Sequence, residues 1–214
     1  VLVLSSKQDA PLLKRCIESF TRHYCHPIFF RVLSDGSFDD IQDIPSINGN
    51  FEILTQRHLS SASQKIIGGR RRVREAFENS IVFRKLVYSR IASSENRVKY
   101  VDSDVIAIRN CLGLFEYETG NYFMDNLSSI ISIHWRDADV LWDISVAASI
   151  NCGLLSVDKD LIDLDILEWA LGLQRISNGS KFHLEQLMWS ILAGSRIDNV
   201  FLYKSEHVCF PDRV

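Results

Sequence analysis

Short apolar runs alternate along the chain with longer segments in which apolar residues recur every three or four positions. Residues 1–4 and 28–33 form nearly continuous apolar runs, which is typical of strands buried on both faces of a parallel sheet. The segment between them has helical spacing, with apolar residues at Leu12, Leu13, Cys16, Ile17 and Phe20. A strand, a helix and a second strand in this order predict a βαβ unit with a right-handed crossover.

The same two patterns continue through the rest of the chain. Further strands are predicted at residues 51–54, 98–101, 122–124 and 153–157. Helices are predicted at residues 83–92, 161–173 and 184–192, and from about Val73, after a polar stretch that runs through Gly68-Gly69. This alternation predicts an α/β fold, a single Rossmann-like αβα sandwich with a mostly parallel central sheet. Because the sequence shows no internal repeat or proline-rich linker, we interpret residues 1–214 as one domain.

One segment between two predicted strands has no clear period. Residues 128–149 are rich in tryptophan and aspartate. An insertion of this kind often lies over a binding cleft. The alternative is a helical excursion that packs its tryptophans into the core, and the sequence leaves both interpretations open.

The composition excludes several classes of protein. A formal charge of −3 argues against a dedicated nucleic-acid binder, because phosphate contacts require a strongly basic surface. The five cysteines are far apart and include no CxxC pair, which favours a reducing compartment over a disulfide framework. No apolar run approaches the ~20 residues that span a bilayer. We therefore expect a cytoplasmic protein, and leave open a peripheral association with a membrane or an anchor beyond this sequence.

The strongest candidate for chemistry is Asp102-Ser103-Asp104, which directly follows the predicted strand at residues 98–101. In open parallel sheets, ligands bind outside the carboxyl ends of the strands. Two carboxylates separated by one small residue can converge on Mn²⁺ or Mg²⁺, with phosphate oxygens and water as further ligands. The alternative is a surface turn or a helix cap. The apolar residues 105–108 favour the metal, because the acids then interrupt core sequence, where a cation would offset the cost of burying them.

Four short strings carry a resemblance to a known family: FRKL at residues 83–86, KYVDSDVI at 99–106, NCGLL at 151–155 and LEQ at 184–186. In order and spacing they resemble bacterial glycosyltransferases of the GT-A type, including relatives of the glycogenin and lipopolysaccharide galactosyltransferase group. The resemblance spans nearly the whole chain, and its diagnostic parts are the DxD tripeptide, the Asn-x-Gly string and the acid-Gln pair. It implies transfer of a sugar, usually a hexose, from a nucleotide-sugar to a hydroxyl of a saccharide, lipid or protein acceptor. The donor in such enzymes is most often a UDP-sugar.

The resemblance also implies residues that hold the nucleotide. Ser5, Ser6 and Asp35 follow the first two predicted strands and would contact the ribose and the base. Asp35 also belongs to a good turn sequence, which is its alternative interpretation. Lys85, and less readily Arg84, would offer a fixed positive charge to the diphosphate, although helix surfaces carry such residues routinely.

Other residues would shape the sugar pocket. Asn151 and Gly153 would run beside the transferred sugar, and the alternative is a turn at the entry of a strand. Glu185 and Gln186 would contact the donor sugar or the acceptor, with Glu185 as a candidate catalytic carboxylate. A glutamate near a helix start is also favourable for capping alone. Asp125, which follows a predicted strand, would bind a sugar hydroxyl or act as a base.

The metal site implied by the resemblance consists of Asp102, Asp104 and His207 as ligands, with Asp102 and Ser103 also touching the nucleotide-sugar. His207 is proposed only because related enzymes supply a third ligand near the end of the domain. The resemblance favours retention of configuration, because no general base for an inverting attack stands out in the sequence.

Two rival functions and one basic segment complete the interpretation. A nucleotidyltransferase would carry a Gly-rich basic loop after the first strand, and residues 5–9 do not resemble one. A non-catalytic nucleotide-sugar-binding domain is disfavoured by intact Asp102 and Asp104. The arginines at residues 70–74 fit a solvated helix start, and the alternatives are closure over the donor phosphates or contact with anionic lipid.

Overall fold

The computed structural model describes eight stretches of the chain, and every structural statement below concerns these residues. They are 1–37, 47–111, 115–116, 118–125, 146–147, 150–173, 184–196 and 199–202. Most of the segment predicted to lie over a cleft, residues 128–149, falls outside them, as does His207.

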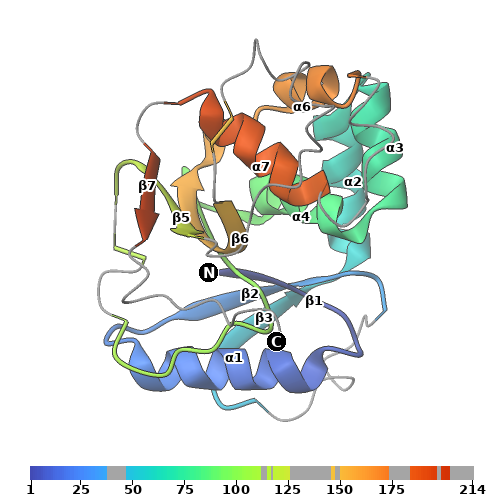
Figure 1. The fold of residues 1–214 in the computed structure, drawn as a ribbon. Helices are drawn as coiled ribbons and strands as arrows, with labels where there is room; N and C mark the ends of the chain where they lie inside the picture. The colour runs from blue at the N-terminus through green and yellow to red at the C-terminus, as the bar shows by residue number, and fades with distance from the viewer. Residues whose placement is uncertain are drawn as a thin grey trace, which may run out of the picture.

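A single open sheet forms the centre of the fold (Figure 1). Its strands are β1 (Leu2–Ser5), β2 (Phe29–Ser34), β3 (Asn50–Leu54), β4 (Arg97–Val101), β5 (Asn121–Asp125), β6 (Ile150–Asp158) and β7 (Asn199–Leu202). The strand order is β3-β2-β1-β4-β6-β5-β7, and β6 alone runs antiparallel to its neighbours. The predicted α/β architecture with a mostly parallel sheet is therefore confirmed.

Helices cover both faces of this sheet (Figure 1). Helix α1 (Ala10–His23) lies on one face, between β1 and β2 in sequence. The other face carries α2 (Gln56–Ile67), α3 (Arg71–Asn79), α4 (Ile81–Ala92), α6 (Leu164–Ala170) and α7 (Leu184–Gly194). A short 3-10 helix, η3 (Lys159–Leu161), precedes α6. No helix in the described part of the chain is long and apolar enough to cross a bilayer.

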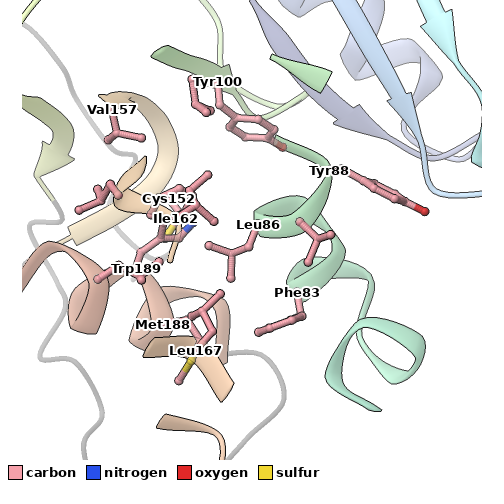
Figure 2. Close-up of a cluster of buried hydrophobic side chains, with 14 of the residues drawn as sticks. Phe83, Leu86, Tyr88, Tyr100, Cys152, Val157, Ile162, Leu167, Met188 and Trp189 are labelled. Atoms are coloured by element: carbon pink, nitrogen blue, oxygen red, sulfur yellow. The ribbon is translucent and has the colours of Figure 1, made fainter. Parts of the chain in front are cut away.

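Two hydrophobic clusters hold these layers together. Between α1 and the sheet, the aromatic rings of Phe20 and Phe30 meet edge to face with centroids 6.3 Å apart. On the opposite face, α4 packs on β4 and α7 packs on β6, and Leu86, Met188 and Trp189 belong to one buried cluster (Figure 2). Trp189 is fully buried, and its ring meets that of Phe123 edge to face. Helix α4 is buried on almost every side over its second half, which explains why its apolar residues follow one another without a polar face.

Several boundaries differ from the prediction. Residues 56–67, predicted as a polar stretch, form α2, because Leu59, Ser63 and Ile67 give it a narrow buried stripe with a spacing of four residues. The predicted helix at residues 161–173 is shorter in the structure: Leu161 ends η3, and the α-helix, α6, covers only Leu164–Ala170. Strand β7 was not predicted.

The sequence after the acidic tripeptide is also different from the expectation. Residues 105–108 were expected in the core, but they form neither helix nor strand, and Ile106 and Ile108 are 44% and 79% exposed. Val105 and Ala107, in contrast, are partly buried against the hydrophobic cluster beneath α1, so the expectation holds for every second residue only. Asn151 and Gly153 lie inside β6 rather than before it, so they are not a strand-entry turn.

The strand order creates a switch point between β1 and β4. From β1 the chain proceeds to β2 and β3 on one side, and β4 then begins the other side. The pairing of β1 with β4 is confined to Leu2 and Tyr100, so the two strands part toward their carboxyl ends. Open α/β sheets bind ligands in the crevice at such a point. Ser5 and Asp102 are the residues that the fold delivers there.

Candidate functional site

Asp102 leaves the sheet at the end of β4 and is anchored by its backbone. Its N–H donates to the carbonyl of Gly153 at 2.7 Å, and its own carbonyl accepts from the N–H of Val105 at 3.1 Å. The Asp102 side chain is 36% exposed, and Asp104 is also exposed, although part of its side chain is covered by the protein. The tripeptide thus turns from the sheet toward solvent within three residues, which places both carboxylates at the switch point of the sheet.

Lys85 lies directly beneath Asp102. It extends from α4, is 2% exposed, and places Nζ 2.9 Å from Asp102 Oδ1 and 2.8 Å from Glu185 Oε1. Its third donor goes to the carbonyl of Cys152 at 2.8 Å. Burial alone would lower the pKa of Lys85, but the charges of Asp102 and then Glu185 outweigh burial and hold that pKa well above its ordinary value. Lys85 is therefore a permanent buried cation.

This geometry gives Lys85 a different place from the predicted one. An ammonium group has three N–H donors, and in Lys85 all three are engaged inside the protein. In this geometry no N–H donor of Lys85 is left to bind a diphosphate directly. Arg84 is also engaged, because its guanidinium donates to the carbonyls of Phe77, Glu78 and Asp35.

Glu185 is the counter-ion of Lys85 on the side away from Asp102. It lies in the first turn of α7, is 8% exposed, and accepts a hydrogen bond from Trp189 Nε1 at 3.3 Å. Burial raises the pKa of Glu185 above its ordinary value, and the neighbouring Lys85 opposes this rise. The predicted catalytic carboxylate is thus buried and paired.

Tyr100 is the second group that holds Asp102. Its hydroxyl donates to Asp102 Oδ1 at 2.8 Å and accepts from the N–H of Leu4 at 3.2 Å. Its ring also lies under the ammonium of Lys85, 4.3 Å from Nζ to the centroid. Among the described residues, Lys85 and Tyr100 are thus the two side chains that donate hydrogen bonds to the Asp102 carboxylate, and both donate to Oδ1.

The other oxygen of Asp102 faces a space that only glycine leaves open. A methyl group placed on Gly153 would lie 3.3 Å from Asp102 Oδ2, 2.9 Å from Asn151 Oδ1 and 3.3 Å from Met124 Cε. Asn151 Oδ1 itself accepts from the N–H of Gly153 at 2.7 Å. Asn151 and Gly153, predicted to act together, thus lie beside the acidic tripeptide.

The electrostatic balance at this edge is negative. Asp102, Asp104 and Glu185 surround one ammonium group, which leaves an excess of two negative charges when all are ionised. Burial raises the pKa of Asp104, and the charge of Asp102 adds to that rise. The buried thiol of Cys16, which donates to the Asp102 carbonyl at 3.6 Å, has its pKa raised to about 12, first by burial and then by Asp104 and Asp102. A divalent cation would relieve this field.

The donor set fits a hard cation. Carboxylate oxygens of Asp102 and Asp104 suit Mn²⁺ or Mg²⁺, with further ligands from phosphate and water. Among the described residues, the one group of three convergent metal-ligating side chains lies elsewhere, at Cys25, His26 and Glu116. All three are exposed, and His26 Nε2 is already 3.0 Å from the Glu116 carboxylate.

Hydrogen bonds between the loops that follow β1 and β2 order the neighbouring part of this sheet edge. Ser5 is buried, and its carbonyl accepts from the N–H of Asp35 at 3.2 Å. Asp35 Oδ1 accepts from the N–H of Ser37 at 2.8 Å, which is the turn that its sequence alone predicts. Ser6 Oγ donates to Asp9 at 2.6 Å. Ser5, Ser6 and Asp35 therefore share one edge of the sheet, as predicted.

The remaining predicted residues divide into three groups. Gln186 donates to the Ile150 carbonyl at 2.6 Å and so fixes the start of β6. Asp125 ends β5, and nothing is described of its side chain. His207 is not among the described residues. The structure thus assigns no third protein ligand.

The basic segment is a helix start with paired charges. Arg70 donates to Asp165 at 2.7 Å, and Arg72 lies 3.6 Å from Glu168, so α3 is fastened to α6. This agrees with the solvated helix start predicted for these arginines.

Sequence reasoning missed Tyr100 and Cys152. Tyr100 stands two residues before Asp102, so the alternation of a strand would place both side chains on the same side of the chain, and that spacing was the available signal. The carbonyl of Cys152 carries no signal in the sequence.

In comparisons with known proteins, no family model matches the chain, and no curated protein matches it.

Proposed function

We propose that the protein is a metal-dependent glycosyltransferase of the GT-A type, which moves a sugar from a nucleotide diphosphate, most simply a UDP-sugar, to an acceptor hydroxyl. One observation carries the proposal: Asp102 and Asp104 stand at the switch point of the sheet, with Asp102 held on Oδ1 and its Oδ2 left toward the crevice. A surface turn would need neither a buried lysine bonded to Asp102 nor a glycine, Gly153, beside the Asp102 carboxylate.

Asp102 and Asp104 would hold the cation, and Ser103 would contact the nucleotide-sugar. A bound Mn²⁺ or Mg²⁺ supplies charge neutralisation for the departing diphosphate. The loops that carry Ser5, Ser6 and Asp35 are tied together beside β1 and form the edge along which the nucleoside would lie.

The sugar would lie on the β6 side of the crevice, beside Asn151. Its amide offers both a donor and an acceptor to sugar hydroxyls, and Gly153 lets the ligand approach the backbone. Gln186 would act by holding the start of β6. Retention of configuration is part of the proposal, as is a cytoplasmic location, in keeping with the four unpaired cysteines of the described segments.

A nucleotide-sugar screen with and without a chelator tests the proposal. We expect a UDP-sugar with Mn²⁺ to raise the melting temperature and to be hydrolysed slowly, and EDTA to abolish both effects. Stabilisation of about 2.7 kcal/mol is expected at a ligand concentration of about 100 times Kd. The absence of a metal-linked response to every donor would contradict the proposal.

The variant Asp104→Asn narrows the test to the tripeptide. Removing one carboxylate ligand should lower the affinity for the UDP–Mn²⁺ complex by at least ~10-fold, the lower end of what disturbing a metal site costs. Asp160→Asn is the matched control, because Asp160 is exposed in η3. Equal UDP–Mn²⁺ affinity of the wild type and Asp104→Asn would show that the tripeptide is only a turn.

A further inference from the structure

Tyr100 occupies the gap where β1 and β4 separate. The two strands pair only at Leu2 and Tyr100, so the N–H of Leu4 has no ladder partner on β4. The Tyr100 hydroxyl accepts a hydrogen bond from this N–H at 3.2 Å, and the residue as a whole is 1% exposed. The tyrosine therefore replaces a missing sheet hydrogen bond at the switch point.

The same hydroxyl fixes the orientation of Asp102. Rotation about the last bond of an aspartate side chain is broad and roughly two-fold, so an unrestrained Asp102 would exchange its two oxygens. Tyr100 and Lys85 both donate to Oδ1, at 2.8 and 2.9 Å. A carboxylate oxygen has two lone pairs, so these two bonds saturate Oδ1 and leave Oδ2 for a ligand.

We propose that Tyr100 is a positioning residue, which together with Lys85 saturates one oxygen of Asp102 and presents the other, Oδ2, to the divalent cation. The inference rests on one part of the proposed function, namely that Asp102 is a metal ligand. Groups that orient a metal ligand through hydrogen bonds typically change metal affinity about 10- to 100-fold when they are removed.

Direct Mn²⁺ binding is the readout, measured from the electron paramagnetic resonance signal of free Mn²⁺ in the presence of UDP. All proteins carry the additional change Glu116→Gln, which removes the carboxylate, the ligand that Mn²⁺ prefers, from the exposed Cys25–His26–Glu116 group. We expect Tyr100→Phe to weaken Mn²⁺ binding about 10- to 100-fold, while the ring and its packing are retained.

Tyr88→Phe is the matched control. Tyr88 is as deeply buried as Tyr100 and belongs to the same hydrophobic cluster, but it comes from α4 and its ring points away from the centre of the cluster (Figure 2). Its ring contact is with Phe77, 5.4 Å between centroids, and not with Asp102. We expect Tyr88→Phe to bind Mn²⁺ as the parent does, because losing a tyrosine hydroxyl that does not contact Asp102 does not reorient the carboxylate.

A double variant keeps the inference open to refutation if Tyr100→Phe does not fold. Lys85→Met with Glu185→Gln removes the other bond to Oδ1 without leaving a buried charge unpaired. It should also weaken Mn²⁺ binding about 10- to 100-fold. Parental affinity in whichever folded variant is measured overturns the inference and leaves the proposed function standing. No Mn²⁺ binding by the parent itself overturns both.

Discussion

The buried ion pair between Lys85 and Glu185 makes a quantitative prediction about stability. Lys85→Met retains much of the side-chain volume but leaves Glu185, 8% exposed, with only the 3.3 Å hydrogen bond from Trp189. Breaking a buried pair by removing one partner typically costs about 3–5 kcal/mol, out of a total stability of about 5–15 kcal/mol. At about 2–4 °C per kcal/mol for a chain of this size, the melting temperature should fall by roughly 6–20 °C.

The penalty should depend on pH in a defined direction. Burial raises the pKa of Glu185 in the folded protein, and the loss of Lys85, which opposes that rise, would raise it further. A carboxyl whose pKa is higher in the folded than in the unfolded state binds more protons when folded, so its folded form gains stability as the pH falls. The cost of Lys85→Met should therefore be larger at pH 8 than at pH 5.

Urea denaturation followed by circular dichroism at both pH values measures this cost. The double variant Lys85→Met with Glu185→Gln should regain most of the lost stability, because no buried charge is then unpaired. Lys99→Met is the control, since Lys99 makes a partly exposed pair with Glu95 at 3.3 Å and should lose no more than about 1 kcal/mol. A Lys85→Met penalty that does not change with pH would refute the assigned pairing.

Two further predictions concern the crevice and its surroundings. Gly153→Ala should weaken the binding of UDP–Mn²⁺ in calorimetric titrations by at least ~10-fold, because the new methyl lies 2.9 Å from Asn151 Oδ1 and 3.3 Å from Asp102 Oδ2; unchanged affinity would mean that the ligand avoids this side. Arg72→Ala should cost under about 1 kcal/mol, as its 3.6 Å contact with Glu168 is partly exposed. It should leave UDP affinity unchanged, and a loss of affinity would favour closure of the basic segment over the phosphates.

Six of the seven strands were predicted from short apolar runs, as β1 and β2 illustrate, whereas β7 was not. Helix α2 was not predicted either, since most of its residues are polar and its buried stripe is narrow. Strand β6 extends three residues before its predicted start, because its antiparallel partners β4 and β5, not its own composition, decide where pairing begins. Register and pairing of this kind depend on segments far apart in the sequence.

The candidate site shows a similar division. Asp102 could be placed from the sequence, because a strand end is a local feature and its position in the sheet follows from the order of elements. The burial of Lys85 could not be predicted from the sequence. A lysine within a helix is ordinarily exposed, and only the burial of α4 on nearly every side, between the sheet and α7, carries this ammonium into the interior.

The same packing changes what Glu185 can contribute. A carboxylate that attacks or touches a sugar must reach the crevice, yet the Glu185 carboxylate is bound at 2.8 Å to an ammonium that also binds Asp102. The negative charge of Glu185 therefore affects Asp102 through Lys85. It neutralises part of the positive charge of Lys85, which Asp102 would otherwise have to neutralise alone. If Asp102 binds a divalent ion as proposed, Glu185 would leave more of the negative charge of Asp102 available to that ion, although Glu185 itself is buried.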